Sequence, residues 1–197
     1  MIYIQHRINT LEQLEDLNPG FGAEIDLRSD PNSHEIYLHH DLFIKGVSFN
    51  DWISLFAKRG IRGPLILNTK EDGLEAELIV ACESHGIRNF FFLDTALPTL
   101  VKWTCQKNER RFACRLSAYE PLEALEKFKG KADWLWVDCF EGRPLPVTQL
   151  QAAKEHFKLC LVAPELQGVS EVDPAFRAWF NQADAICTKK PAFWQTW

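Results

Sequence analysis

The stretch AEIDLR, residues 23–28, alternates apolar and charged side chains. Successive side chains of a β-strand point to opposite faces, so the apolar residues share one face and Glu24, Asp26 and Arg28 share the other. Two carboxylates on an inward face repel one another and lose hydration, which is costly unless a cation lies between them. The stretch therefore predicts a strand that packs against helices on one face and carries a polar site on the other.

Seven further short runs rich in apolar residues, many of them β-branched or aromatic, accompany this one, and helical patterns separate most of them. The eight runs are residues 2–6, 23–27, 64–70, 89–94, 111–116, 134–138, 158–163 and 184–188. Helices are expected from Ser48 to Arg59 and from Leu74 to His85, and residues 34–41 read as an additional strand. Thr10 and Gln13 have the spacing of a helix-capping box.

Strands that are buried on both faces and joined by helices indicate an α/β fold with a parallel sheet. Eight strand–helix units in 197 residues predict a small (β/α)8 TIM barrel, a fold whose lower limit is about 200 residues. No linker or low-complexity stretch divides the chain, so we expect one domain over residues 1–197. The alternative is an open doubly wound sheet, but that fold normally has a glycine-rich phosphate loop where this chain reads His6-Arg7-Ile8-Asn9.

Composition excludes several classes of protein. The 46% of hydrophobic residues argue against disorder, and 22 Lys and Arg against 27 Asp and Glu, without a basic run, disfavour a nucleic-acid partner. No apolar stretch approaches the roughly 18 residues of a membrane span, and the first ten residues lack a secretion signal, so we expect a cytoplasmic protein. The six cysteines show no C-x-x-C pair and are expected to be free thiols. The sequence does not indicate an oligomeric state.

Polar residues gather at the predicted strand ends, where a barrel of this type has its active site. The first strand ends in His6-Arg7, the third contains Asn68 and Lys70 on one face, and His39-His40-Asp41 lies between the second and third. Each alone has an ordinary structural explanation, such as an ion pair between Arg28 and the two carboxylates. Together they suit phosphate chemistry: a divalent ion such as Mg²⁺ or Ca²⁺ on the carboxylates, imidazoles to move protons, and cations to hold the anion.

The order His6-Arg7, Glu24-x-Asp26, His40-Asp41 and Lys70 resembles the glycerophosphodiester phosphodiesterase family, whose wider group includes phosphatidylinositol-specific phospholipase C. The resemblance extends to the segment 185–191 near the end of the chain. It implies a TIM barrel that hydrolyses small phosphodiesters with the help of a divalent metal.

The resemblance also assigns roles by position. His6 and His40 become the acid–base pair, and Arg7 and Lys70 become phosphate-binding groups. Glu24 and Asp26 become metal ligands. His39 receives no role, since strand alternation points it to the opposite face.

The chain departs from the family pattern at three places. Ile8 follows the His-Arg pair where the family has a small residue, and the short insertion that recognises glycerol after the His-Asp pair has no clear equivalent. Asn68 stands where the family has its third metal carboxylate, so we expect weaker metal binding, with Asn68 as the third ligand. Asp94 and Asp138, at other strand ends, are alternative sources of the missing charge.

These residues predict a metal-assisted phosphodiester hydrolase that acts on a small-molecule phosphodiester through two histidines. The alternative is a catalytically degenerate barrel that binds a phosphorylated ligand or a partner protein. A lyase that releases a cyclic phosphate shares the same two-histidine logic. The alcohol groups on either side of the phosphorus are not determined by the sequence.

Overall fold

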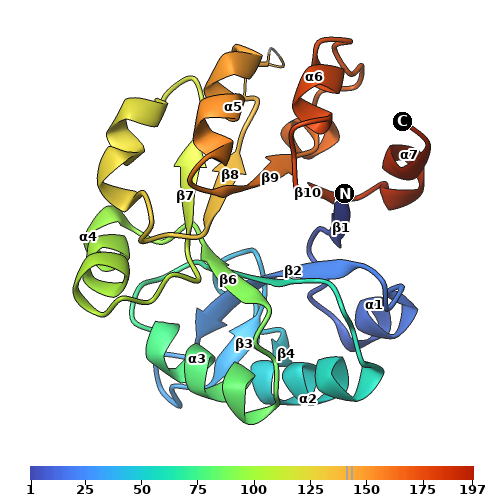
Figure 1. The fold of residues 1–197 in the computed structure, drawn as a ribbon. Coiled ribbons are helices and arrows are strands. Elements are labelled where there is room, and N and C mark those ends of the chain that lie inside the picture. The colour runs from blue at the N-terminus through green and yellow to red at the C-terminus, as the bar shows by residue number, and fades with distance from the viewer. Residues whose placement is uncertain (141, 143) are drawn as a thin grey trace. The chain divides into compact units, whose positions relative to one another are not determined.

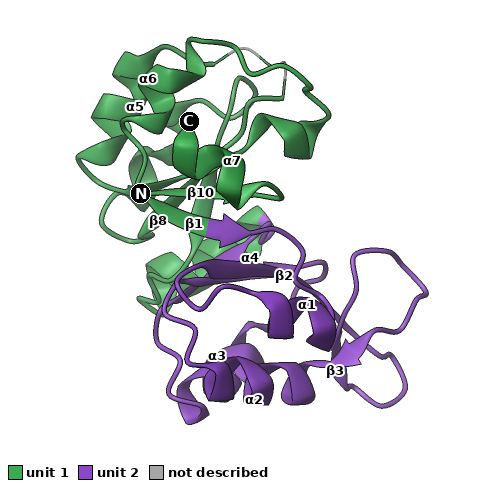
Figure 2. Cartoon of the chain, turned by 90° about the vertical axis from the view of Figure 1, so that its right-hand side faces the viewer, with its two compact units in different colours: residues 1–3, 97–197 green, residues 4–96 purple. Residues whose placement is uncertain are grey.

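A computed structural model describes residues 1–140, 142 and 144–197 of the chain. Two compact units are formed (Figure 2): the N-unit, residues 4–96, and the C-unit, residues 1–3 with 97–197. The first strand, β1 (Ile2–Gln5), begins in the C-unit and ends in the N-unit.

The N-unit is organised around its longest strand, β2 (Gly22–Ser29). The end of β1 and the whole of β5 (Leu65–Thr69) run parallel to β2, and β6 (Phe90–Leu93) runs parallel to β5. The short strands β3 (Ile36–Leu38) and β4 (Val47–Ser48) form an antiparallel extension at the carboxyl end of β2. The carboxyl ends of the parallel strands thus lie at one edge of the N-unit.

Three helices, α1 (Leu11–Asp16), α2 (Phe49–Arg59) and α3 (Glu75–Ser84), lie along one side of β2 (Figure 2). The α1 helix begins with the predicted capping box, in which the Thr10 hydroxyl accepts from the Gln13 amide and the Gln13 side chain accepts from the Thr10 amide. The α2 helix buries its apolar face, as its periodicity predicts.

The C-unit contains four strands in sequential parallel order, shown from yellow-green to red in Figure 1. They are β7 (Ala113–Leu116), β8 (Trp134–Val137), β9 (Lys158–Val162) and β10 (Ala185–Thr188). The connecting helices are α4 (Leu97–Val101), the π-helix η1 (Lys102–Gln106), the 3-10 helices η2 (Leu122–Phe128) and η3 (Pro164–Gln167), α5 (Val147–Lys154), α6 (Phe176–Phe180) and α7 (Pro191–Thr196). Aromatic packing joins α6 to α7, since the rings of Phe176 and Trp194 have centroids 5.4 Å apart.

The observed elements confirm the predicted α/β class. Each of the eight predicted apolar runs contains a strand, and the additional strand expected within residues 34–41 is β3. The two predicted helices are α2 and α3, and all six cysteines are free. In the described part of the chain, no helix has both the length and the apolar character needed to cross a membrane. Closure of the strands into one barrel domain remains a prediction.

Candidate active site

The β2 strand places two acidic side chains in the interior of the N-unit. Glu24 and Asp26 are each about 1% exposed and point to the same face of β2, as the alternation of the sequence predicts. Asp26 pairs in register with Asn68 of β5, so the Asn68 side chain lies beside them on that face. The fold thus brings together all three residues that the sequence proposes as metal ligands.

Both carboxylate oxygens of Glu24 are occupied by N–H donors. The backbone amide of Arg7 donates to Oε2 at 2.8 Å, and Nδ2 of Asn68 donates to Oε1 at 2.9 Å. Nε2 of His6 lies 3.7 Å from Oε2. Glu24 therefore links the end of the first strand to β5.

Asp26 is surrounded by cations and by one amide. Nζ of Lys70 lies 2.9 Å from Oδ1, and Nε of Arg7 lies 3.7 Å from Oδ2. Nδ2 of Asn9 donates to Oδ2 at 2.7 Å, while the Asp26 backbone amide donates to Oδ1 of Asn9 at 2.9 Å. Asp26 thus positions both predicted phosphate-binding cations.

The two buried carboxyls differ in pKa. Burial, followed by repulsion from Asp26, raises the pKa of Glu24 to about 7, although the N–H donors of Asn68 and Arg7 oppose the rise. Burial also acts to raise the pKa of Asp26, but Lys70, Asn9 and Arg7 outweigh it and hold that pKa below its usual range. At neutral pH Asp26 is charged, whereas Glu24 is only partly ionised.

Arg7 adopts an unusual backbone conformation. Its φ of 57° lies in the left-handed region, which a non-glycine residue rarely adopts. This turn directs the Arg7 amide to Glu24, and the following Ile8 amide donates to the backbone oxygen of Glu24 at 2.9 Å. The Ile8 side chain is buried. The expected effect of Ile8 on the shape of the phosphate site stays a prediction.

His40 is held at the end of β3 by two contacts. Nδ1 of His40 lies 2.8 Å from Oδ1 of Asp41, and the His40 backbone oxygen accepts from Nη2 of Arg28 at 2.8 Å. Because Arg28 belongs to β2, it ties His40 to the strand that carries Glu24 and Asp26. The His39 backbone amide donates to the Asp26 backbone oxygen at 3.1 Å.

Two of these residues have roles that the sequence did not reveal. Asn9 holds Asp26 with a reciprocal pair of hydrogen bonds, and only its position just after His6-Arg7 hinted at the site. An ion pair of Arg28 with the two carboxylates was the alternative, purely structural explanation of this strand. Arg28 contacts the His40 backbone, and Arg7 and Lys70 supply the ion pairs of Asp26.

A divalent cation would be held here by oxygens of Glu24, Asp26 and Asn68. Oδ1 of Asn68 is buried and has no hydrogen-bond partner within the described residues, so this oxygen is available to bind a cation. The described residues hold no group of three or more His, Cys, Asp or Glu side chains suited to a metal. Two carboxylates and one amide oxygen are nevertheless the kinds of ligand that a hard divalent ion prefers. Such an ion would compete with Lys70 for Oδ1 of Asp26.

The alternative third carboxylates differ in their surroundings. Oδ2 of Asp94 lies 4.0 Å from Nζ of Lys70, which places Asp94 at the rim of this cluster. In the C-unit, Asp138 is buried, forms an ion pair with Arg115 and accepts from Nε2 of Gln167 at 2.6 Å. Asp138 thus has its charge balanced within its own unit.

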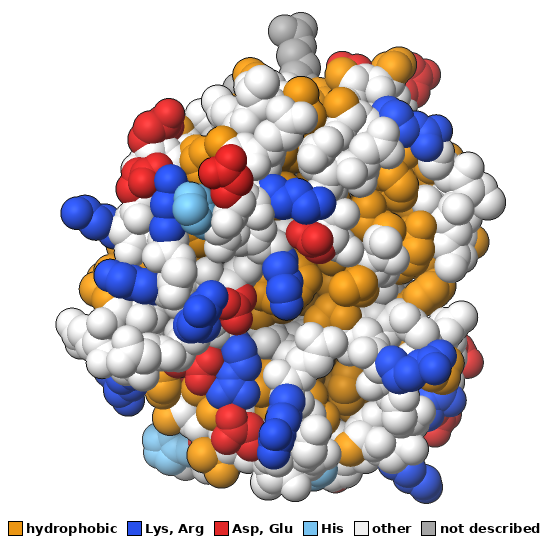
Figure 3. All heavy atoms as spheres, in the orientation of Figure 1, with side chains coloured by type: hydrophobic (Ala, Val, Ile, Leu, Met, Phe, Trp, Pro, Cys, Tyr) orange, Lys and Arg blue, Asp and Glu red, His pale blue; other side chains and the backbone are white. Residues whose placement is uncertain are grey.

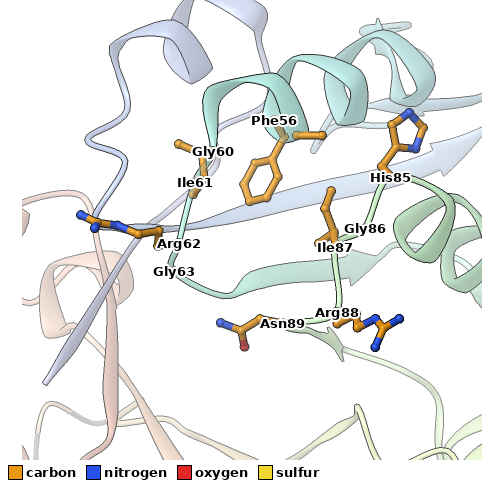
Figure 4. A pocket seen from close by; sticks show the side chains of 11 residues that line it. Phe56, Gly60, Ile61, Arg62, Gly63, His85, Gly86, Ile87, Arg88 and Asn89 are labelled. Carbon is orange, nitrogen blue, oxygen red and sulfur yellow. The ribbon is translucent and has the colours of Figure 1, made fainter.

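Pockets open at both ends of the N-unit strands. One, of about 210 Å³, lies at the amino ends of β5 and β6, where Phe56, Ile61 and Ile87 form an apolar floor with Arg62 and His85 near the rim (Figure 4). The other, of about 380 Å³, lies at the carboxyl end of β2 and includes Arg28 and Glu71, the neighbour of Lys70. The lining of the larger pocket includes Arg28, which contacts the His40 backbone, but none of Glu24, Asp26 and Lys70. On the face shown in Figure 3, Lys and Arg side chains are interspersed with Asp and Glu.

Comparison with known proteins finds solved structures with a similar fold. No protein-family model matches the chain, and no curated protein matches its sequence. A provisionally assigned glycerophosphodiester phosphodiesterase from Galdieria sulphuraria superposes with a TM-score of 0.74 at 18% identity, over 99% of this chain and 96% of that one. A phosphodiesterase from Oleispira antarctica, solved with the product sn-glycerol-3-phosphate, gives 0.70 at 17% identity, over 100% and 96%.

A glycerophosphodiester phosphodiesterase from Agrobacterium tumefaciens superposes with a TM-score of 0.69 at 12% identity, over the full length of both chains. The likeness extends over the whole chain, whereas the identities are low. The structural comparison confirms, at the level of fold, the resemblance carried by the strand-end residues. The chain has the fold of the solved glycerophosphodiester phosphodiesterases.

Proposed function

We propose that this chain is a phosphoric diester hydrolase that acts on a small-molecule phosphodiester at the carboxyl ends of β1, β2, β3 and β5. The observation that carries the proposal is the buried Glu24–Asp26 pair, which holds His6, Arg7 and Lys70 around one point. The structural likeness to glycerophosphodiester phosphodiesterases supports the same chemistry.

Arg7 and Lys70 bind the phosphate in this proposal. Both cations are ion-paired to Asp26 on one side and are partly exposed on the other, so an anion approaches without losing all of its water. Guanidinium and ammonium groups donate charge-assisted hydrogen bonds to phosphate oxygens. The buried charge of Asp26 keeps the two cations in place before the substrate arrives.

His40 and His6 move the protons. The Asp41 carboxylate faces Nδ1 of His40 at 2.8 Å, which fixes the N–H on that nitrogen and leaves Nε2 to accept a proton. His6 lies beside Glu24 and takes the complementary role. One imidazole removes the proton of the attacking hydroxyl, and the other protonates the departing alkoxide as the phosphorus–oxygen bond breaks.

The attacking hydroxyl is either water or a neighbouring hydroxyl of the substrate. Attack by water yields a phosphomonoester and an alcohol directly. Attack by a substrate hydroxyl yields a cyclic phosphate and an alcohol, and water then opens the ring. Both routes use the same two histidines.

A bound Mg²⁺ or Ca²⁺ on Glu24, Asp26 and Oδ1 of Asn68 would polarise the phosphoryl oxygens and offset the charge that develops on them. Oδ1 of Asn68, which has no hydrogen-bond partner among the described residues, supports this assignment. Asn68 also supplies one charge fewer than a carboxylate. We therefore expect weak metal binding that strengthens when a phosphate is present.

The proposal includes two expectations from the sequence. Residues 1–197 act as a single closed (β/α)8 barrel, which the full-length superpositions support. The cytoplasmic location expected from the sequence stays a prediction.

Hydrolysis of glycerophosphocholine and related diesters tests the function. Phosphorus NMR identifies the products, in assays with Mg²⁺, Ca²⁺, Mn²⁺ or a chelator. His6→Ala and His40→Ala are each expected to lower kcat by about 10²- to 10⁴-fold. His85→Ala, an exposed histidine at the end of α3, is the matched control. Full activity in both site variants would overturn the mechanism.

The hydrogen bond from Asn68 to Glu24 favours a second candidate, a barrel that binds a phosphorylated ligand without turnover. That amide proton lies where a third carboxylate would otherwise face Glu24 across a cation. This candidate predicts that phosphodiesters raise the melting temperature while no product forms over a broad substrate panel.

A further inference from the structure

A hairpin loop of residues 39–46 joins β3 to β4 and contains the catalytic candidate His40 near its start. Its tip carries three consecutive large apolar side chains, Leu42, Phe43 and Ile44, which are 61%, 99% and 50% exposed. We refer to these three residues as the apolar tip. Elsewhere in the described chain, exposed large apolar side chains occur singly, as the terminal pair Met1–Ile2 or as the contacting pair Tyr119 and Phe140.

The loop is anchored at both ends, so the apolar tip is held in position. At its start, the His39 amide donates to the Asp26 backbone oxygen. At its end, Gly46 packs so closely on Leu38 that a Cβ would lie 1.8 Å from the Leu38 backbone oxygen. Between them, Nζ of Lys45 forms a 2.8 Å ion pair with Glu35.

Phe43 has a φ of 64°, the left-handed region that bulky residues rarely adopt. Strained backbone persists where the surrounding structure enforces it, and it concentrates at functional sites. Here the strain accompanies an aromatic ring that is fully exposed to water. Nothing in folding alone rewards such an arrangement, because exposed apolar surface is stabilised only when it is covered.

Two residues of the apolar tip, Leu42 and Phe43, line the pocket of about 380 Å³ at the carboxyl end of β2. Arg28, which donates to the His40 backbone oxygen, and Glu71, which follows Lys70 in the chain, also line it. This volume falls within the range of small-molecule sites, about 300–1,000 Å³. The pocket thus connects the apolar tip with residues that contact His40 and follow Lys70, and we expect one alcohol group of a phosphodiester held by Arg7 and Lys70 to extend toward it.

We propose that the apolar tip binds the hydrocarbon chain of an amphiphilic phosphodiester, so that the substrate class is single-chain phospholipids. This inference rests on the proposed function, because the phosphate of the same molecule must occupy the site of Arg7 and Lys70. A free glycerol group presents hydroxyls and gains nothing from Leu42, Phe43 and Ile44. An alkyl or acyl chain gains free energy by covering the apolar surface of these three side chains.

Binding of two matched phosphodiesters tests the inference. Dodecylphosphocholine, kept below its micelle concentration, and glycerophosphocholine share the phosphocholine group and differ in the hydrocarbon chain. Isothermal titration calorimetry measures both with the wild type, with the triple variant Leu42→Ser/Phe43→Ser/Ile44→Ser, and with Val80→Ser/Leu97→Ser. The last variant removes two equally exposed apolar side chains outside the loop.

The wild type is expected to bind dodecylphosphocholine at least about tenfold more tightly than glycerophosphocholine. The triple variant is expected to lose about 10- to 100-fold of the affinity for dodecylphosphocholine. Circular dichroism checks that the variants are folded, and the single variant Phe43→Ser provides the same comparison with a smaller change.

Equal affinity of the wild type for the two ligands would overturn the inference, as would an equal loss in the Val80→Ser/Leu97→Ser control. The proposed function is tested separately, by measuring hydrolysis of the diesters. If the protein hydrolyses glycerophosphocholine but does not prefer dodecylphosphocholine, the proposed function holds and hydrocarbon binding by the apolar tip is wrong. If the protein prefers dodecylphosphocholine but hydrolyses no diester, hydrocarbon binding holds and the proposed hydrolase function is wrong.

Discussion

Nδ2 of Asn68 donates a 2.9 Å hydrogen bond to Oε1 of Glu24, and both side chains are buried. A neutral amide therefore contacts the carboxyl where the resemblance leads one to expect a second carboxylate and a metal between them. The charge of the neighbouring Asp26 is balanced by Lys70 and Arg7. Groups of the protein thus pair both buried carboxyls of the site.

Asn68→Glu is expected to tighten Ca²⁺ binding by about tenfold or more, because affinity for hard cations rises with the number of carboxylate ligands. Isothermal titration calorimetry measures the affinity, and the Ca²⁺-dependent rise in melting temperature provides a second readout. Asn68→Gln keeps the neutral amide and is the control. Equal Ca²⁺ affinity in Asn68→Glu and the wild type would place the ion elsewhere, with Asp94 as the next residue to substitute.

The raised pKa of Glu24 predicts that the metal-free protein loses stability between about pH 4.5 and 7. The folded state holds this proton more tightly than the unfolded state, so the stabilisation is complete below pH 4.5 and fades as the pH rises through 7. The loss is about 3 kcal/mol in the free energy of unfolding, at about 1.4 kcal/mol per pKa unit. Urea unfolding in EDTA at several pH values measures it.

Glu24→Gln removes the titrating group and is expected to flatten this pH dependence. The lowered pKa of Asp26 acts in the opposite direction, since its stabilisation is lost as the pH falls through the folded pKa. That change lies at lower pH and is retained in the variant. A wild type and a Glu24→Gln variant with parallel pH profiles would contradict the assignment.

Lys70→Met is expected to lower the free energy of unfolding by about 1–3 kcal/mol, because it leaves the buried charge of Asp26 with Arg7 as its remaining cation. Lys58→Met, an exposed lysine on α2, provides the matched control and is expected to change stability by less than about 0.5 kcal/mol. Urea unfolding at pH 7 compares the two. The Lys70 variant is also expected to bind inorganic phosphate more weakly, whereas equal stability of the two variants would show that Asp26 does not depend on Lys70.

Gly46→Ala is expected to destabilise the hairpin loop by about 1–3 kcal/mol, since its Cβ would collide with the Leu38 backbone oxygen. Gly20→Ala, whose Cβ would meet only the Asn18 side chain at 3.2 Å, is the control. Hydrogen exchange of residues 36–48 detects loosening of the loop, and thermal unfolding measures the overall cost. Unchanged exchange in Gly46→Ala would show that this end of the loop is not anchored by the contact.

Much of the α/β architecture was predictable because it depends on local patterns. Alternation in β2 correctly placed Glu24 and Asp26 on one buried face, and the Thr10–Gln13 spacing correctly marked the start of α1. The strand runs were readable because strands buried on both faces need continuous apolar sequence.

Partner choice was harder to predict, because it depends on which side chains converge from distant segments. Arg28 follows Asp26 on the same strand face, and an ion pair with the carboxylates was one of two explanations of that pattern, yet Arg28 contacts the His40 backbone. Asn9 carried no chemical signal in the sequence, and only the left-handed turn at Arg7 and the packing after it bring Asn9 onto Asp26.

The sequence by itself determined the alternating strands and helices, the inward face of Glu24 and Asp26, and the order of residues suited to phosphate chemistry. Tertiary structure alone decided that Lys70, Arg7 and Asn9 satisfy Asp26, that the Asn68 amide donates to Glu24, and that the apolar tip stands exposed beside His40. Side-chain periodicity is a local property of the backbone, whereas the charge balance of a buried site depends on groups brought together from separate strands.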